Sequence, residues 1–178
     1  MEDIKYLKLL AREFPNVAAV STEIINLSAI LCLPKGTEHM ISDIHGEYGA
    51  FLHMLKNASG VVREKIDLLF EKSVPQAERD ELATLIYYPR EKLELIHESC
   101  PDLGAWYAKT LPRLTDVCRL AAAKYTRSKV RKALPQGFEY IIDELLHAAD
   151  TQSRQRYQET ILSTIVDIGR ADAFIVAI

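Results

Sequence analysis

The amino-acid sequence predicts a mainly α-helical chain with one or a few short strands. Apolar residues recur every three or four positions along most of the 178 residues, which is the spacing of amphipathic helices. Proline residues separate these segments, at positions where helices begin or end. The exception is Glu38–Ser42, which follows a Lys-Gly-Thr turn and is predicted to be a strand. A single strand has no partner to pair with and is not stable alone.

The first three helices are predicted from their apolar faces and from the residues at their ends. Pro15 should end the first helix, and Asn16 can cap the second, which Pro34 should end. A third helix is expected to begin at about Glu47 and to end near Ser59–Gly60, a plausible C-cap.

A second series of helices follows without a clear strand. Ser73 is expected to cap one of them, with Gln76 at capping-box spacing, and Pro89 should begin the next. Pro112 is expected to break the following segment into two helices. Later helices are predicted at about residues 137–149 and 153–170. The final run, Asp172–Ile178, is almost purely apolar, which indicates an element interrupted in its middle; the alternative is a helix or strand docked into the core.

The composition excludes several classes of protein. A net charge of −3 gives no sign of a nucleic acid or an anionic membrane as partner. The three cysteines are odd in number, widely spaced and free of any C-x-x-C pattern, so a reducing cytoplasm is expected. The N-terminus does not resemble a signal peptide, and the apolar stretch Ile24–Leu33 is too short to span a bilayer.

The candidate functional residues are Asp43 and His45, which lie at the end of the predicted strand. A carboxylate oxygen and an imidazole nitrogen two residues apart can both point at one metal ion, and Gly46 lets the backbone turn away. This arrangement looks like half of a dinuclear metallophosphatase site. The structural alternative is that Asp43 is a turn or N-cap residue and His45 a surface histidine.

The other half of such a site is absent from the sequence. None of its glycines is followed by Asp or Asn, so no Gly-Asp-x-x-Asp-Arg or Gly-Asn-His motif exists. His97 and His147 are interpreted as packed or solvated helix residues rather than ligands, and no catalytic residue is assigned. Glu47 could orient a ligand, although its negative charge also simply favours the start of a helix. A basic cluster could bind phosphate or a nucleotide effector, but a solvated helix face is the usual meaning of such a run; it comprises Lys124, Arg127, Lys129, Arg131 and Lys132.

Taken together, these motifs give the chain a family resemblance along its whole length. It resembles the N-terminal portion of the class III fructose-1,6-bisphosphatases of Firmicutes, which are similar to the calcineurin-like metallophosphatases. The stretches that carry the resemblance are His39–Phe51 (HMISDIHGEYGAF), Leu55–Ile66, Tyr87–Pro89 and Asp167–Asp172.

The resemblance implies an αββα sandwich with two metal ions, usually manganese, in which Asp43 and His45 bind the first ion. Residues 1–59 would begin the phosphatase domain, 60–170 would be a helical insertion, and 171–178 would begin the remainder of that domain. The implied reaction is hydrolysis of the 1-phosphate of fructose 1,6-bisphosphate in gluconeogenesis, by a metal hydroxide at a dinuclear centre. This chain alone would be an inactive portion of a cytoplasmic, homo-oligomeric bacterial enzyme.

Two other functions remain open. The first is another calcineurin-like metallophosphatase, such as a protein or dinucleotide-polyphosphate phosphatase, although the long helical segment after Asp-x-His argues against it. The second is a non-catalytic helical interaction module in which Asp-x-His is vestigial. Such a module would fold cooperatively alone and bind no divalent metal.

Overall fold

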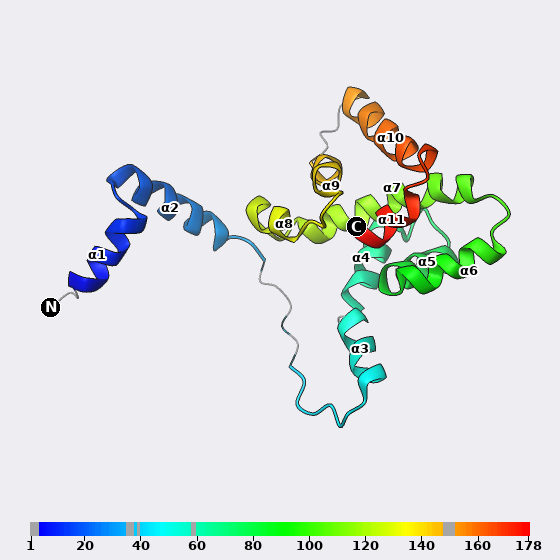
Figure 1. Ribbon diagram of the computed structural model, residues 1–178, viewed down its shortest axis with the longest axis horizontal. Coiled ribbons are helices and arrows are strands. Elements are labelled where there is room, and N and C mark those ends of the chain that lie inside the picture. The colour runs from blue at the N-terminus through cyan, green and yellow to red at the C-terminus, as the bar shows by residue number, and fades with distance from the viewer. Residues whose placement is uncertain (1–3, 35–37, 39, 58–59, 148–151) are drawn as a thin grey trace. The chain divides into compact units, whose positions relative to one another are not determined.

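The computed structural model describes residues 4–34, 38, 40–57, 60–147 and 152–178. Those residues form helices joined by turns, and none of them belongs to a β-strand, so the mainly helical prediction is confirmed (Figure 1). The helices are α1 (Ile4–Glu13), α2 (Val17–Ile30), α3 (Tyr48–Asn57), α4 (Val61–Phe70), α5 (Gln76–Tyr87), α6 (Pro89–Ser99), α7 (Leu103–Ala122), α8 (Arg127–Ala133), α9 (Glu139–Leu146), α10 (Gln152–Asp167) and α11 (Ala171–Ala177).

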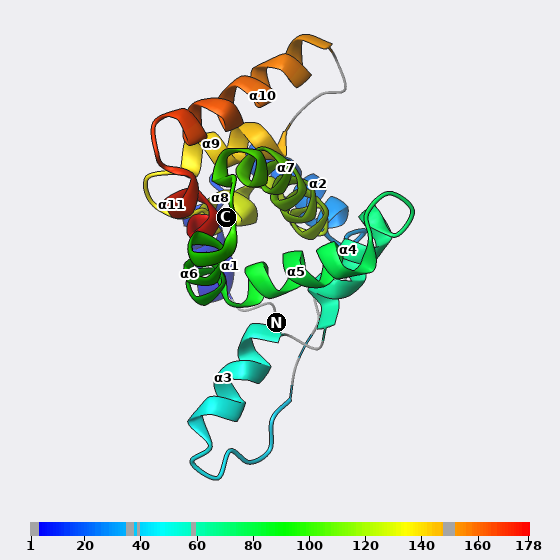
Figure 2. The same ribbon diagram turned by 90° about the vertical axis from the view of Figure 1, so that its right-hand side faces the viewer.

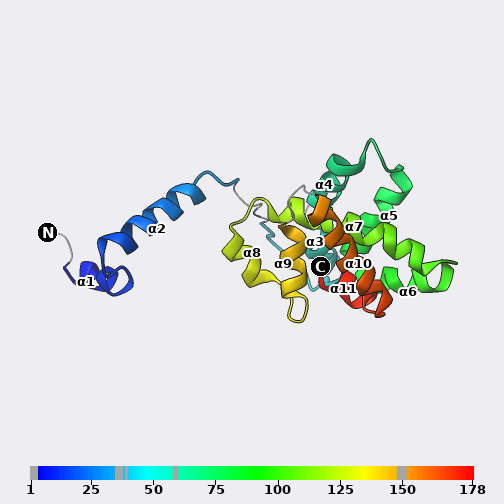
Figure 3. The ribbon, with the colours of Figure 1, turned by 90° about the horizontal axis from the view of Figure 1, so that it is seen from above.

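The chain divides into two compact units, Met1–Gly36 and Thr37–Ile178. In the first unit, α1 and α2 follow one another as two short rods (Figure 3). Asn16 caps α2 as predicted, because its side chain accepts a 2.9 Å hydrogen bond from the Ala19 N–H. Neither helix buries a residue, although α2 is mostly apolar. Among the described residues, no helix combines the length and the apolar character needed to cross a bilayer.

The second unit is organised around α7, its longest helix. This helix packs against α4, α9, α10 and α11 (Figure 2). The side chains that fill the core are fully or almost fully buried and come from seven helices, α4 to α7 and α9 to α11; the largest fully buried ones are Ile66, Leu85, Leu111, Ile142, Leu145 and Phe174. Burial of apolar surface against α7 is therefore the main force that holds these helices together.

The prediction that Pro112 breaks the helix is wrong, because α7 continues through it. Pro112 itself is exposed, so its ring does not disturb the core. Leu111 and Leu114 are buried on either side of it, and the Thr115 hydroxyl donates a 2.9 Å hydrogen bond to the Leu111 carbonyl. Packing on both sides therefore outweighs the one backbone hydrogen bond that proline cannot donate.

The predicted Ser73 cap is also wrong. Helix α5 begins at Gln76, its N-cap is Pro75, and no side chain caps it. Arg79 organises this corner instead: its guanidinium is nearly buried and donates 2.7 Å hydrogen bonds to the Val74 carbonyl and to Asp67 Oδ1. The Pro89 prediction is confirmed, since α6 begins there.

The strand predicted at Glu38–Ser42 is not found. His39 lies outside the described residues, and the other four residues of the stretch form neither helix nor strand. The physical reason is that a strand needs a hydrogen-bonded neighbour, which none of the described residues provides. The first part of the phosphatase domain was predicted to end at residue 59, which also lies outside the described residues. Gly60 is the N-cap of α4.

The apolar run at Asp172–Ile178 forms most of α11, which docks into the core. Phe174 is fully buried and meets Phe138 edge-on, with ring centroids 5.5 Å apart. Ile175 is buried beside it. The run is therefore a helix docked into the core, and the interpretation of an interrupted element stays a prediction.

Candidate metal centre

The Asp-x-His motif lies in a tight turn that leads into α3. His45 and Gly46 both adopt left-handed backbone angles, with φ of 50° and 75°. The Glu47 N–H donates to the Ile44 carbonyl at 2.9 Å, and α3 then begins at Tyr48. Glycine accepts this conformation freely, whereas a histidine pays about 1 kcal/mol for it. The turn therefore stores a small backbone strain at the residue that carries the imidazole.

The turn brings the two predicted ligands together. His45 Nε2 lies 3.0 Å from Asp43 Oδ2, and the side chains are 79% and 64% exposed. These are the two atoms that a divalent cation would take, one hard oxygen and one borderline nitrogen. The donor chemistry therefore fits part of a metal coordination shell, and the high exposure leaves one side of the pair open to further ligands.

The described residues do not complete that shell. They contain no group of three or more His, Cys, Asp or Glu side chains that could hold a metal ion. His97 and His147 lie elsewhere, since His97 contacts Asp172 at 2.7 Å and His147 contacts the Asp143 carbonyl at 2.7 Å. The role of Asp43 and His45 as ligands therefore remains a prediction.

A contact that the sequence did not reveal holds α3 against the start of α6. The His53 ring stacks on the Tyr88 ring, with the ring centroids 6.0 Å apart, and also contacts the Tyr88 hydroxyl. Lys56 Nζ lies 4.5 Å from the centroid of the same ring and 3.4 Å from Glu91 Oε1, with which it forms an ion pair. Because α3 follows the Asp-x-His turn directly, Tyr88 links the candidate centre to the helical body. The sequence alone indicated only that one helix ends and another begins near Tyr88.

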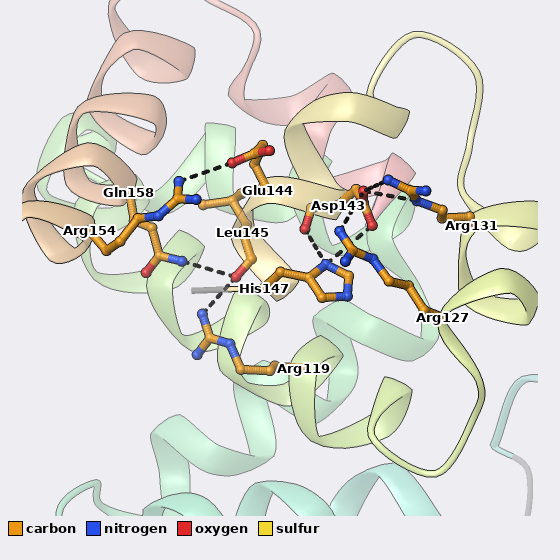
Figure 4. Close-up of polar contacts among 9 residues, drawn as sticks. All are labelled: Arg119, Arg127, Arg131, Asp143, Glu144, Leu145, His147, Arg154 and Gln158. Carbon is orange, nitrogen blue, oxygen red and sulfur yellow. Dashed lines mark hydrogen bonds and ion pairs between the residues drawn. The ribbon is translucent and has the colours of Figure 1, made fainter. Parts of the chain in front are cut away.

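The basic cluster is mostly a solvated face, as expected, because Arg127, Lys129, Arg131 and Lys132 are exposed, and its two arginines lie near Asp143 (Figure 4). Arg131 binds Asp143 Oδ2 through Nε at 3.1 Å and through a terminal nitrogen at 2.9 Å. This hydrogen bond holds the pKa of Asp143 below its usual range, with Arg127 and His147 adding smaller effects. Lys129 instead lies over the Tyr125 ring, 4.7 Å from its centroid.

Comparison with known proteins identifies the family. A family model described as Firmicute fructose-1,6-bisphosphatase matches residues 5–178. The chain therefore belongs to the Firmicute fructose-1,6-bisphosphatase family.

Individual relatives carry the same description. The chain is 58% identical to fructose-1,6-bisphosphatase class 3 of Clostridium novyi (strain NT) and 58% identical to that of Clostridium tetani (strain Massachusetts / E88). It is 55% identical to the class 3 enzyme of Clostridium botulinum (strain Loch Maree / Type A3). Each comparison covers 99% of this chain and 27% of the relative, so the chain spans about a quarter of the length of these relatives. No solved structure matches it.

Proposed function

We propose that this chain is the N-terminal portion of a cytoplasmic bacterial fructose-1,6-bisphosphatase, which hydrolyses the 1-phosphate of fructose 1,6-bisphosphate in gluconeogenesis. The observation that carries this proposal is the match to the Firmicute family over residues 5–178, with identities up to 58% to relatives named for that activity. The Asp43–His45 pair supplies the chemistry that such a match calls for.

In this proposal Asp43 and His45 hold the first of two manganese ions, and the remaining ligands come from outside these 178 residues. The bound ions would polarise the phosphate and acidify the attacking water. The left-handed turn at His45 and Gly46 keeps both ligand side chains on one side of the backbone. Glu47, just before α3, would help to orient the pair.

The same proposal explains why residues 38–42 form no strand in this structure and why most of the chain is helical. Residues 38–42 would pair with the sheet of an αββα sandwich, and residues 60–170 would form the helical insertion between two metal motifs. The exposed apolar side chains of α2 support burial against further protein, either the remaining phosphatase domain or another subunit of a homo-oligomer.

The first test is the mass of the native polypeptide together with its reading frame beyond Ile178. Continuation into Gly-Asp-x-x-Asp-Arg and Gly-Asn-His motifs supports the proposal. A polypeptide that ends at Ile178 and binds no Mn²⁺ contradicts it and favours a helical interaction module.

The second test is phosphate release from fructose 1,6-bisphosphate by the full polypeptide loaded with Mn²⁺. Asp43→Asn and His45→Gln should each lower kcat/KM by about 100-fold or more and reduce bound manganese, because each removes a ligand. His97→Gln is the matched control, since His97 also contacts an aspartate but lies in the helical body. Normal activity and manganese content in both ligand variants would refute the assignment.

A further inference from the structure

A cavity of about 250 Å³ lies where α7, α8 and α9 meet. Its charged lining residues are all basic and come from three different elements: Arg119 from α7, Arg127 from α8, and His147 from the end of α9. The rest of the lining is apolar or aromatic and comprises Ala122, Ala123, Tyr125, Val130 and Leu146. The lining of the cavity therefore combines apolar side chains with hydrogen-bonding groups from three elements.

Arg119 leaves one donor unused. One terminal nitrogen donates to Asp116 Oδ1 at 2.7 Å. The other donates to the Leu145 carbonyl at 2.8 Å, as Figure 4 shows. Its Nε is buried and has no hydrogen-bond partner within the described part of the chain. A buried donor without a partner is costly. Each terminal nitrogen of the Arg119 guanidinium has a second N–H, through which Arg119 can donate to a ligand in the cavity.

Arg127 also keeps free donor capacity, and His147 keeps one free ring nitrogen. His147 Nδ1 lies 2.7 Å from the Asp143 carbonyl and so carries the proton of that hydrogen bond, which leaves Nε2 of the uncharged ring as a hydrogen-bond acceptor. Arg127 approaches Asp143 Oδ2 only to 3.8 Å, which is too long for a hydrogen bond. Arg131 takes that oxygen instead, at 2.9 Å. Asp143 is therefore neutralised by Arg131, and the guanidinium of Arg127 remains available.

Two lysines add to the positive potential without filling the cavity. The ammonium groups of Lys124 and Lys129 lie 5.2 Å and 4.7 Å from the centroid of the Tyr125 ring, which lines the cavity. The nearby carboxylates of Asp116 and Asp143 are each engaged by an arginine. Because Arg119 itself pairs with Asp116, the positive potential that an anion meets here comes chiefly from Arg127, Lys124 and Lys129.

We propose that this cavity binds a phosphate monoester with a compact apolar body. The phosphate would accept hydrogen bonds from Arg119 and Arg127, whose guanidinium groups have the matching geometry, and a protonated phosphate oxygen would donate one to His147 Nε2. The organic part would lie on the alanine and valine floor beside Tyr125. The site uses neither Asp43 nor His45, so it stands independently of the proposed hydrolysis.

Calorimetric titration of the full polypeptide with phenyl phosphate tests the proposal. The protein is first treated with EDTA, so that a metal centre cannot contribute to binding. Saturable binding is expected, and Arg127→Gln should weaken it by about tenfold or more, because a charged hydrogen-bond donor is lost. Arg154→Gln is the control: Arg154 also carries an exposed guanidinium, but it pairs with Glu144 at 3.2 Å and does not line the cavity.

His147→Gln provides a second test, since it replaces a cavity hydrogen-bonding group on a different element. Weaker binding in both cavity variants, with unchanged binding in the Arg154 variant and unchanged thermal unfolding in all three, supports the site. Equal losses in the Arg127 and Arg154 variants would show general charge attraction and overturn it. Absence of saturable binding by the unmodified protein would overturn it as well.

Discussion

The phenol of Tyr107 donates a 2.6 Å hydrogen bond to Oδ1 of Asp172, a residue 65 positions further along the chain. The other oxygen of the same carboxylate lies 2.7 Å from His97 Nε2. One aspartate at the start of α11 therefore connects α6, α7 and α11. Burial, together with the hydrogen bond to Asp172, raises the pKa of Tyr107 well above its ordinary value of 10.

Removing the Tyr107 hydroxyl should destabilise the helical unit. Tyr107→Phe is expected to lower the free energy of unfolding by about 1 kcal/mol, because the hydrogen bond is lost while the ring remains. Urea unfolding followed by circular dichroism measures the change. Tyr48→Phe is the control, since Tyr48 is 72% exposed, and an equal effect of the two variants would contradict the role of Asp172.

The same phenol should make the protein sensitive to alkali. Because the folded pKa is raised, the contribution of Tyr107 is fully present below about pH 10 and is lost as the pH rises further, where the unfolded chain releases the proton first. Unfolding curves between pH 9 and pH 11 should show a loss of stability that is smaller in Tyr107→Phe. Parallel pH curves for the two proteins would argue against a raised pKa.

Asp143 should stabilise the junction of α8 and α9 at neutral pH. Its folded pKa is lowered, first by the hydrogen bond from Arg131, so its contribution is present above the unfolded value of about 3.8 and is lost as the pH falls below it. Asp143→Asn is expected to cost about 1 kcal/mol at pH 7, because the arginine partners are exposed and water screens the pair. The difference between the two proteins should shrink by pH 3. A constant difference across this range would contradict the charge-based account, and Glu144→Gln is the control on the same helix.

The two prolines Pro112 and Pro89 should respond oppositely to replacement by alanine. Pro112→Ala restores an N–H in the middle of α7 and is expected to stabilise the protein by about 1–2 kcal/mol, after allowing for the greater freedom of the unfolded chain. Pro89→Ala, at the first position of α6, should destabilise it by about 0.5–1 kcal/mol. Denaturant unfolding measures both, and a loss of stability in the Pro112 variant would mean that its ring makes essential contacts.

Docking of α11 should be necessary for the stability of the helical unit. Phe174→Ala removes a fully buried ring and is expected to cost about 3–5 kcal/mol of unfolding free energy. Leu68→Ala, at a residue 76% exposed, should change it by less than about 0.5 kcal/mol. Similar values for the two variants would show that α11 does not contribute to the core.

Several elements were predictable because their signals are local. Asn16 caps α2 through a hydrogen bond to a residue three positions away, and Pro89 begins α6 because its fixed φ suits a first helical turn. The Asp43–His45 pair was predictable for the same reason, since two residues of spacing and one turn bring the side chains together. Metal ligands that come from distant segments of the chain produce no such local sequence pattern.

The sequence by itself determined the helical class of this chain, most helix ends and the pairing of Asp43 with His45, because these depend on neighbours within a few residues. Only the tertiary structure decided that α7 runs through Pro112, that Arg79 rather than Ser73 organises the start of α5, and that Arg119, Arg127 and His147 share one cavity. Those outcomes depend on burial and on contacts between residues far apart in the chain. Local propensity contributes only a few tenths of a kcal/mol to about 3 kcal/mol per residue, which the packing of a core can outweigh.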